Sequence, residues 1–61
     1  MYNEYRKMKP KLVEMYRTNG QRRAAELAVS SFIPLLALYT FLEEEGYNFN
    51  EKIRDLRNFY E

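Results

Sequence analysis

An uncharged stretch over residues 32–42 constrains the fold of this 61-residue chain more than any other feature. It places apolar side chains on every side of a helix, and such a helix is normally buried all round. Two other short helices can hardly cover every face of it. We therefore expect a second chain, either another copy or a different protein, to cover the remainder. The alternative is that a kink at Pro34 lets the other helices of the same chain wrap around the stretch.

The same stretch does not predict a membrane span. Crossing a bilayer takes about 20 apolar residues, whereas Ser31 and Glu43 confine this stretch to eleven. The first residues of the chain alternate polar and aromatic side chains and lead into no apolar segment, so we expect no signal peptide. These features predict a cytoplasmic protein and disfavour a membrane partner.

The first helix is predicted over about 10–18. Met8 and Met15 stand one heptad apart on an apolar seam with helical spacing. Pro10 suits the first turn, because the N–H that proline lacks would have no partner there. Residues 1–9 are then expected to form a looser basic arm.

Pro34 forces a break in the middle of the chain, because proline kinks or ends an unbroken helix. Ser31 offers a solution: as an N-cap it would place the proline in the first turn of a new helix. We therefore predict helices over about 21–29 and 32–45, the second of them ended by Gly46.

The last helix is predicted over about 49–60. Asn48 and Glu51 resemble a capping box at its start, and every third or fourth residue after them is apolar, which indicates an amphipathic helix. No strand pattern or linker occurs. The expected fold is all-α: a single domain over 1–61, built as a compact bundle of three to four short helices.

The net charge of +1 hides an asymmetry along the chain. Residues 1–23 carry seven cations and two acids, whereas residues 24–46 carry four acids and no cation. The simplest interpretation is that the basic and acidic segments lie side by side in the fold. The other is that the basic segment is an arm that binds nucleic acid or acidic lipid.

The charges of the segment 21–45 also oppose the helix dipole, since cations begin it and the acidic run 43–45 ends it. Two arrangements would compensate. In one, the arginine pair 22–23 of one chain meets the acidic run of an antiparallel second chain. In the other, the first helix packs antiparallel on this segment and brings three lysines near the acidic run within one chain. Those lysines are Lys7, Lys9 and Lys11.

The composition argues against catalysis. Without His or Cys, the usual nucleophile systems cannot be built and the usual zinc ligands are missing. Two glycines are too few for a phosphate-binding loop. Successive helical residues point about 100° apart, so the acidic run 43–45 does not converge on one ion. We expect no enzyme, no cofactor and no metal.

One segment, residues 23–30, resembles the first helix and turn of helix-turn-helix DNA-binding domains. It has small residues within a helix and a valine–serine pair near the turn. The resemblance implies that the next helix would enter the major groove, where a reading helix must offer polar side chains. The uncharged stretch 32–42 departs from that pattern, which implies that the second helix is buried or binds protein.

We therefore expect a small non-catalytic protein-interaction module, such as an adaptor, inhibitor or accessory regulator, which self-associates or binds another protein through an apolar helical face. The residues of that face are Phe32, Leu35, Leu36, Tyr39 and Phe41, joined by Met8 and Met15. The charges expected to orient the partner are Arg22, Arg23, Glu43, Glu44 and Glu45. The alternative is a nucleic-acid-binding regulator that uses the basic N-terminal third and stacks its rings on bases. The cations of that alternative are Arg6, Lys7, Lys9, Lys11 and Arg17.

Overall fold

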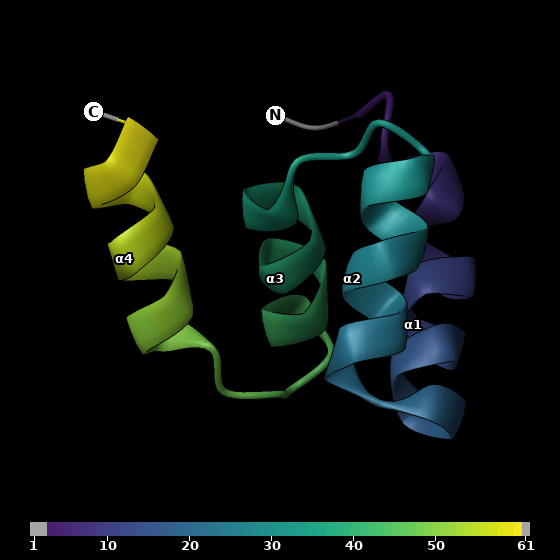
Figure 1. Cartoon of the computed structure of the whole chain (residues 1–61). Helices are drawn as coiled ribbons and strands as arrows, with labels where there is room; N and C mark the ends of the chain where they lie inside the picture. Colours follow the sequence, from purple (N-terminus) through teal and green to yellow (C-terminus); the bar gives the residue numbers. More distant parts are fainter. Residues whose placement is uncertain (1–2, 61) are drawn as a thin grey trace.

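Successive helices alternate in direction along the chain, so that each lies beside the one before it (Figure 1). The computed structural model describes residues 3–60, and their side chains up to residue 59. A short 3₁₀ helix, η1, precedes four α-helices. Their bounds are Arg6–Met8 (η1), Lys9–Asn19 (α1), Gln21–Ser30 (α2), Leu35–Glu44 (α3) and Asn50–Tyr60 (α4). The predicted all-α bundle of short helices is confirmed.

Helix α3 occupies the centre of the bundle, between α4 on one side and the α1–α2 pair on the other (Figure 1). Its buried residues are Ala37, Leu38, Tyr39, Phe41 and Leu42. The Cα radius of gyration of 10.6 Å matches the value of about 10.5 Å expected for a compact chain of this length.

The chain itself covers much of the stretch 32–42, so the other helices suffice to enclose most of it, and a second chain on the remainder stays a prediction. Six of its residues are buried, four are partly buried, and Phe32 is its one exposed residue. The physical reason lies in three fully buried alanines, Ala24 and Ala28 of α2 and Ala37 of α3. Their small side chains let neighbouring helices approach closely, so short helices suffice to enclose the centre. The break near Pro34 that permits this wrapping is present.

The third helix begins three residues later than predicted. Ser31 ends α2 as its C-cap and does not cap α3, which starts at Leu35 after the extended Pro34 (φ −59°, ψ 143°). The reason is steric: proline disfavours helical backbone in the residue before it, which is Ile33. A helix therefore cannot run continuously through residues 32–34.

Gly46 terminates α3, as predicted, although the last helical residue is Glu44 and not residue 45. The Gly46 N–H donates to the Glu43 carbonyl at 3.0 Å, and the Tyr47 N–H donates to the Leu42 carbonyl at 3.2 Å. This pair of bonds is a Schellman motif, which requires a left-handed residue at the position of the glycine, and Gly46 has φ +99°. Among the described residues, no helix is long and apolar enough to cross a membrane.

Asn48 lies two residues before the start of α4 and bonds to the first helical N–H, not to that of residue 51 as the predicted capping box requires. Its Oδ1 accepts a hydrogen bond at 3.2 Å from the N–H of Asn50, the first residue of the helix. The aromatic residue between them, Phe49, packs its ring against Tyr16 of α1 and Tyr39 of α3, at centroid distances of 5.7 and 5.1 Å. These contacts fix the connection between α3 and α4 to the rest of the bundle.

Candidate functional site

A charged seam joins the N-terminal segment to the end of α3. Both terminal nitrogens of Arg6 donate to the Glu44 carboxylate, at 3.0 and 2.9 Å, and Lys9 Nζ donates to the same carboxylate at 2.9 Å. The hydrogen bonds from Arg6 and from Lys9 lower the pKa of Glu44 from its ordinary 4.5 to about 2. The basic and acidic segments therefore lie side by side within one chain, which confirms the simplest interpretation of the charge asymmetry.

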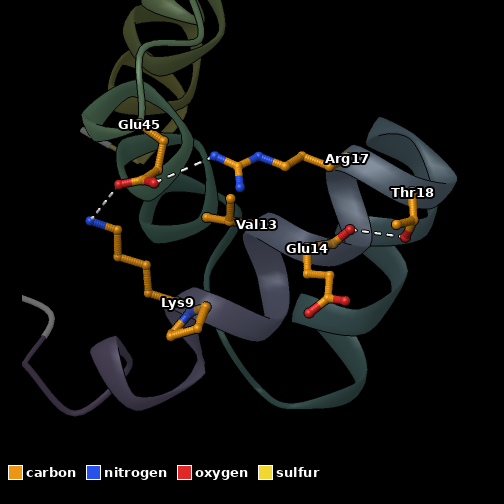
Figure 2. A pocket seen from close by; sticks show the side chains of 7 residues that line it. Lys9, Val13, Glu14, Arg17, Thr18 and Glu45 are labelled. Carbon is orange, nitrogen blue, oxygen red and sulfur yellow. Dashed lines mark hydrogen bonds and ion pairs between the residues drawn. The ribbon is translucent and has the colours of Figure 1, made fainter.

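The second acid of the seam, Glu45, lies between two cations of α1 beside a hollow of about 490 Å³ (Figure 2). Lys9 Nζ is 3.5 Å and Arg17 Nη2 is 3.7 Å from its carboxylate oxygens. Arg17 Nε also donates to the Tyr47 hydroxyl at 2.9 Å. Because a carboxylate of the chain already occupies the position between the cations, this hollow is a poor site for an external anion.

The seam accounts for half of the charges that the sequence analysis assigned to partners. Three of the five cations of the nucleic-acid alternative, namely Arg6, Lys9 and Arg17, are paired with Glu44 or Glu45. The other two, Lys7 and Lys11, are exposed. These pairs also offset the unfavourable position of acids at the C-terminal end of α3.

The arginines expected to orient a partner pair within their own helix. Arg22 Nε lies 3.7 Å and Arg23 Nη1 lies 3.2 Å from the Glu26 carboxylate. Glu43, the remaining orienting charge, is partly exposed near the end of α3.

The predicted apolar face is divided between the core and the surface. Tyr39 is 5% exposed and Phe41 is fully buried, so their expected exposure on a contact face is wrong. The physical reason is their position on the central helix: the Tyr39 hydroxyl accepts a hydrogen bond from Gln21 at 3.1 Å, and the Arg6 guanidinium lies 5.4 Å from the Phe41 ring centroid. Four others are partly buried against the core. They are Met8, Met15, Leu35 and Leu36.

Phe32 is the exception, because 89% of it is exposed. It lies in the α2–α3 turn with φ +58° and is the one described residue other than glycine with a positive φ. Its N–H donates to the Val29 carbonyl at 3.1 Å, and the Ile33 N–H donates to the Ala28 carbonyl at 2.8 Å. This is the same Schellman motif that ends α3, with phenylalanine at the position that Gly46 takes there.

A shallow groove of about 390 Å³ lies beside this turn. Its lining residues are Arg22, Ala25, Glu26, Val29, Ser30 and Leu35. Val29 is 60% exposed. We give the name turn patch to Phe32 together with the three apolar residues that line the groove, Ala25, Val29 and Leu35.

The sequence interpretation missed Ala25 and Val29, because a stripe of two small apolar residues on α2 resembles any half-buried helix face. A signal was present, however. If α2 is taken to end at Ser30, Ser31 becomes its C-cap. A Schellman motif then predicts a left-handed residue at position 32.

The resemblance to helix-turn-helix domains, with the uncharged stretch in place of a reading helix, implied that the second helix is buried or binds protein. Its counterpart here is α3, which places five residues in the core and offers no charged side chain before Glu43. The fold and the turn patch together define a small all-α protein with an exposed apolar turn. Comparison of the chain with protein-family models, curated proteins and solved structures finds no match.

Proposed function

We propose that this chain is a small non-catalytic interaction module, acting as an adaptor, inhibitor or accessory regulator that binds a protein through the turn patch. The observation that carries the proposal is Phe32, an exposed aromatic residue on left-handed backbone. The fold alone gives no reason for an aromatic residue there, because glycine satisfies the same motif at residue 46 without the steric cost of a Cβ.

The energetics of the turn support this proposal. Left-handed backbone costs a residue with a side chain about 1–2 kcal/mol, and Phe32 recovers little of this by burial because it is 89% exposed. Strained residues persist where they serve recognition or catalysis more often than elsewhere. A large aromatic ring held out from the surface is a typical anchor for binding a protein.

The turn also fixes the backbone of Phe32 in advance of binding. Two backbone hydrogen bonds, from Phe32 to Val29 and from Ile33 to Ala28, fix the backbone of the turn. Ile33 is 4% exposed and Ala28 is fully buried, so the turn is anchored in the core. A preorganised anchor loses less conformational entropy on binding than a flexible one.

The nucleic-acid alternative has less support. Backbone phosphates are bound by free cations, whereas Arg6, Lys9 and Arg17 are paired with Glu44 and Glu45 within the chain.

The experiment is capture with the immobilised chain from a lysate of the cells that make it, using three variants of one residue. Phe32→Tyr keeps the ring and should retain the captured protein. Phe32→Ala and Phe32→Gly remove the ring and should no longer capture the protein. Capture by the wild type should persist in 0.5 M salt. Equal capture by all variants, or recovery of nucleic acid in place of protein, would contradict the proposal.

A further inference from the structure

We infer that residues 3–8 form a strap, which closes over Phe41 in dilute salt and opens when rising ionic strength weakens its attachment to the end of α3. The strap belongs to the charged seam, so it neither uses the turn patch nor depends on the proposed function. Three properties of the segment indicate this behaviour: its backbone hydrogen bonds are local, its junction with α1 interrupts the helix, and an exposed ion pair attaches it to α3.

The backbone of the strap is bonded to itself and to the first residue of α1. The Arg6 N–H donates to the Asn3 carbonyl at 3.3 Å, and the Met8 N–H donates to the Tyr5 carbonyl at 2.9 Å. The Lys9 N–H donates to the Arg6 carbonyl. Among the described residues, no backbone hydrogen bond joins the strap to α2, α3 or α4. Side chains must therefore hold it in place.

The junction between the strap and α1 interrupts the helical ladder of hydrogen bonds. In a continuous α-helix the N–H of residue 10 would donate to the carbonyl of residue 6, but Pro10 has no N–H. The Lys9 N–H bonds to this carbonyl instead, over the shorter spacing of a 3₁₀ turn. A bend at this junction therefore leaves the hydrogen bonds of α1 intact.

Arg6 is the side chain that fastens the strap to α3. Both of its terminal nitrogens donate to the Glu44 carboxylate, at 3.0 and 2.9 Å, which fixes the orientation of the guanidinium. The same guanidinium lies over the Phe41 ring, 5.4 Å from its centroid, and Phe41 is fully buried. Tyr5 and Met8 are partly buried against the core. Opening the strap removes Arg6 from the ring and frees these two side chains.

This fastening is of the kind that salt weakens. The side chains of Arg6 and Glu44 are 44% and 35% exposed, and an exposed ion pair is both weak and screened. Between 0.1 and 1 M salt the screening length falls from about 10 Å to about 3 Å. We expect the equilibrium constant for opening to rise about fivefold when the pair is lost, the upper end for an exposed pair.

The rest of the seam does not belong to the strap. Lys9, the first residue of α1, lies 2.9 Å from the Glu44 carboxylate and 3.5 Å from that of Glu45. Leu12 and Val13 of α1 are buried in the core. Helix α1 therefore keeps its own contacts when the strap opens, and opening is distinct from unfolding.

The experiment is a salt titration of the full chain, labelled with ¹³C at its methionine methyl groups and followed by NMR from about 0.02 to 1 M NaCl. The Met8 methyl group reports the strap. Met15 is the matched control, because it is also partly buried against the core but lies in α1. As salt rises, the Met8 resonance should move toward its position in an unfolded chain, while the Met15 resonance stays in place.

Two variants test the ion pair itself. Arg6→Gln and Glu44→Gln should each move the Met8 resonance along the same line in dilute salt and abolish most of its salt dependence. The double variant should move it little further than either single variant, because both break one interaction. The control is Glu26→Gln, which removes the exposed pairs of α2 with Arg22 and Arg23 and should leave the Met8 resonance unchanged.

A neutral, soluble gadolinium chelate then tests whether the strap covers the ring. It should increase the relaxation of the Phe41 ring protons more in Glu44→Gln than in the wild type. Equal relaxation in the two chains overturns the inference. So does a Met8 resonance that Glu44→Gln leaves in place, since packing alone would then hold the segment. Met8 and Met15 resonances that move together would show loosening of the whole fold, and this also overturns it.

Discussion

Replacing Phe32 by glycine should make the isolated fold more stable. The substitution keeps the α2–α3 turn and its two backbone hydrogen bonds but removes the Cβ from a residue at φ +58°. An aromatic core residue would lose several kcal/mol on truncation. The opposite sign is expected here, because the ring is on the surface and the backbone is strained.

The magnitude follows from three terms. Relief of left-handed backbone contributes about 1–2 kcal/mol, and the greater freedom of glycine in the unfolded chain costs about 0.5–1 kcal/mol. Loss of burial is small, because a fully buried phenylalanine contributes about 1.5–3 kcal/mol and Phe32 is 89% exposed. The net gain is about 0.5–1 kcal/mol, which corresponds to a rise in Tm of about 2–8 °C for a domain of this size.

The assay is urea and thermal unfolding followed by far-UV circular dichroism, at low micromolar concentration so that self-association does not contribute. Two matched variants serve as controls that separate loss of the ring from relief of backbone strain. Phe32→Ala removes the ring but keeps the strain, so its stability should stay within about 0.5 kcal/mol of the wild type. Gly46→Ala introduces the strain at the equivalent position. Because an added Cβ there meets no atom within 4 Å, its loss of about 1 kcal/mol or more would measure backbone strain alone.

A Phe32→Gly chain that is no more stable than the wild type would refute this reasoning. It would mean that the ring stabilises the folded chain despite its exposure. The strained turn would then no longer indicate a role in recognition.

Three further predictions concern the fold. Glu44→Gln should reduce acid sensitivity: a pKa lowered to about 2 means that Glu44 stabilises the fold above pH 4.5 and that this contribution disappears as pH falls toward 2. Unfolding measured across pH 2–7 should show the free energies of unfolding of the wild type and Glu44→Gln converging at low pH. Solvent screening limits their difference to about 1 kcal/mol. Leu38→Ala, at a fully buried position, should cost about 2–5 kcal/mol and leave much of the chain unfolded by circular dichroism. Phe49→Ala removes two ring contacts, each worth about 0.5–1.5 kcal/mol. Hydrogen exchange should quicken in α4 more than in α2, because α4 packs against no described helix other than α3.

The helices that could be predicted from the sequence are those with local start and stop signals. The ranges 10–18, 21–29 and 49–60 lie within one residue of α1, α2 and α4 at each end. Each is bounded by residues whose preference acts over one turn, such as the glycine at 20 or the Asn48 side chain. Such preferences need no knowledge of the rest of the fold.

The start of α3 could not be predicted in the same way, because Ser31 fits two roles. A serine between two helical segments can end the first or begin the second, and the restriction that Pro34 places on the backbone of Ile33 decides between them. The sequence predicted that the central stretch is buried, but it left open whether the chain's own helices or a second chain would bury it. The answer depends on Ala24, Ala28 and Ala37 letting helices approach closely, which is a property of tertiary packing and not of periodicity.

The candidate site is therefore what remains after the chain has used its apolar residues for its own core. A domain of 61 residues has a stability of about 3–9 kcal/mol, so a cost of 1–2 kcal/mol at one turn is a considerable part of the total. The end of α3 satisfies the same motif with Gly46, without that cost. A phenylalanine in the left-handed position of the α2–α3 turn reduces the stability of the fold without filling the core. Burial of its ring against a binding partner would offset this loss of free energy. The exposed ring, rather than the long apolar stretch as a whole, is thus the feature of this chain that points to a partner.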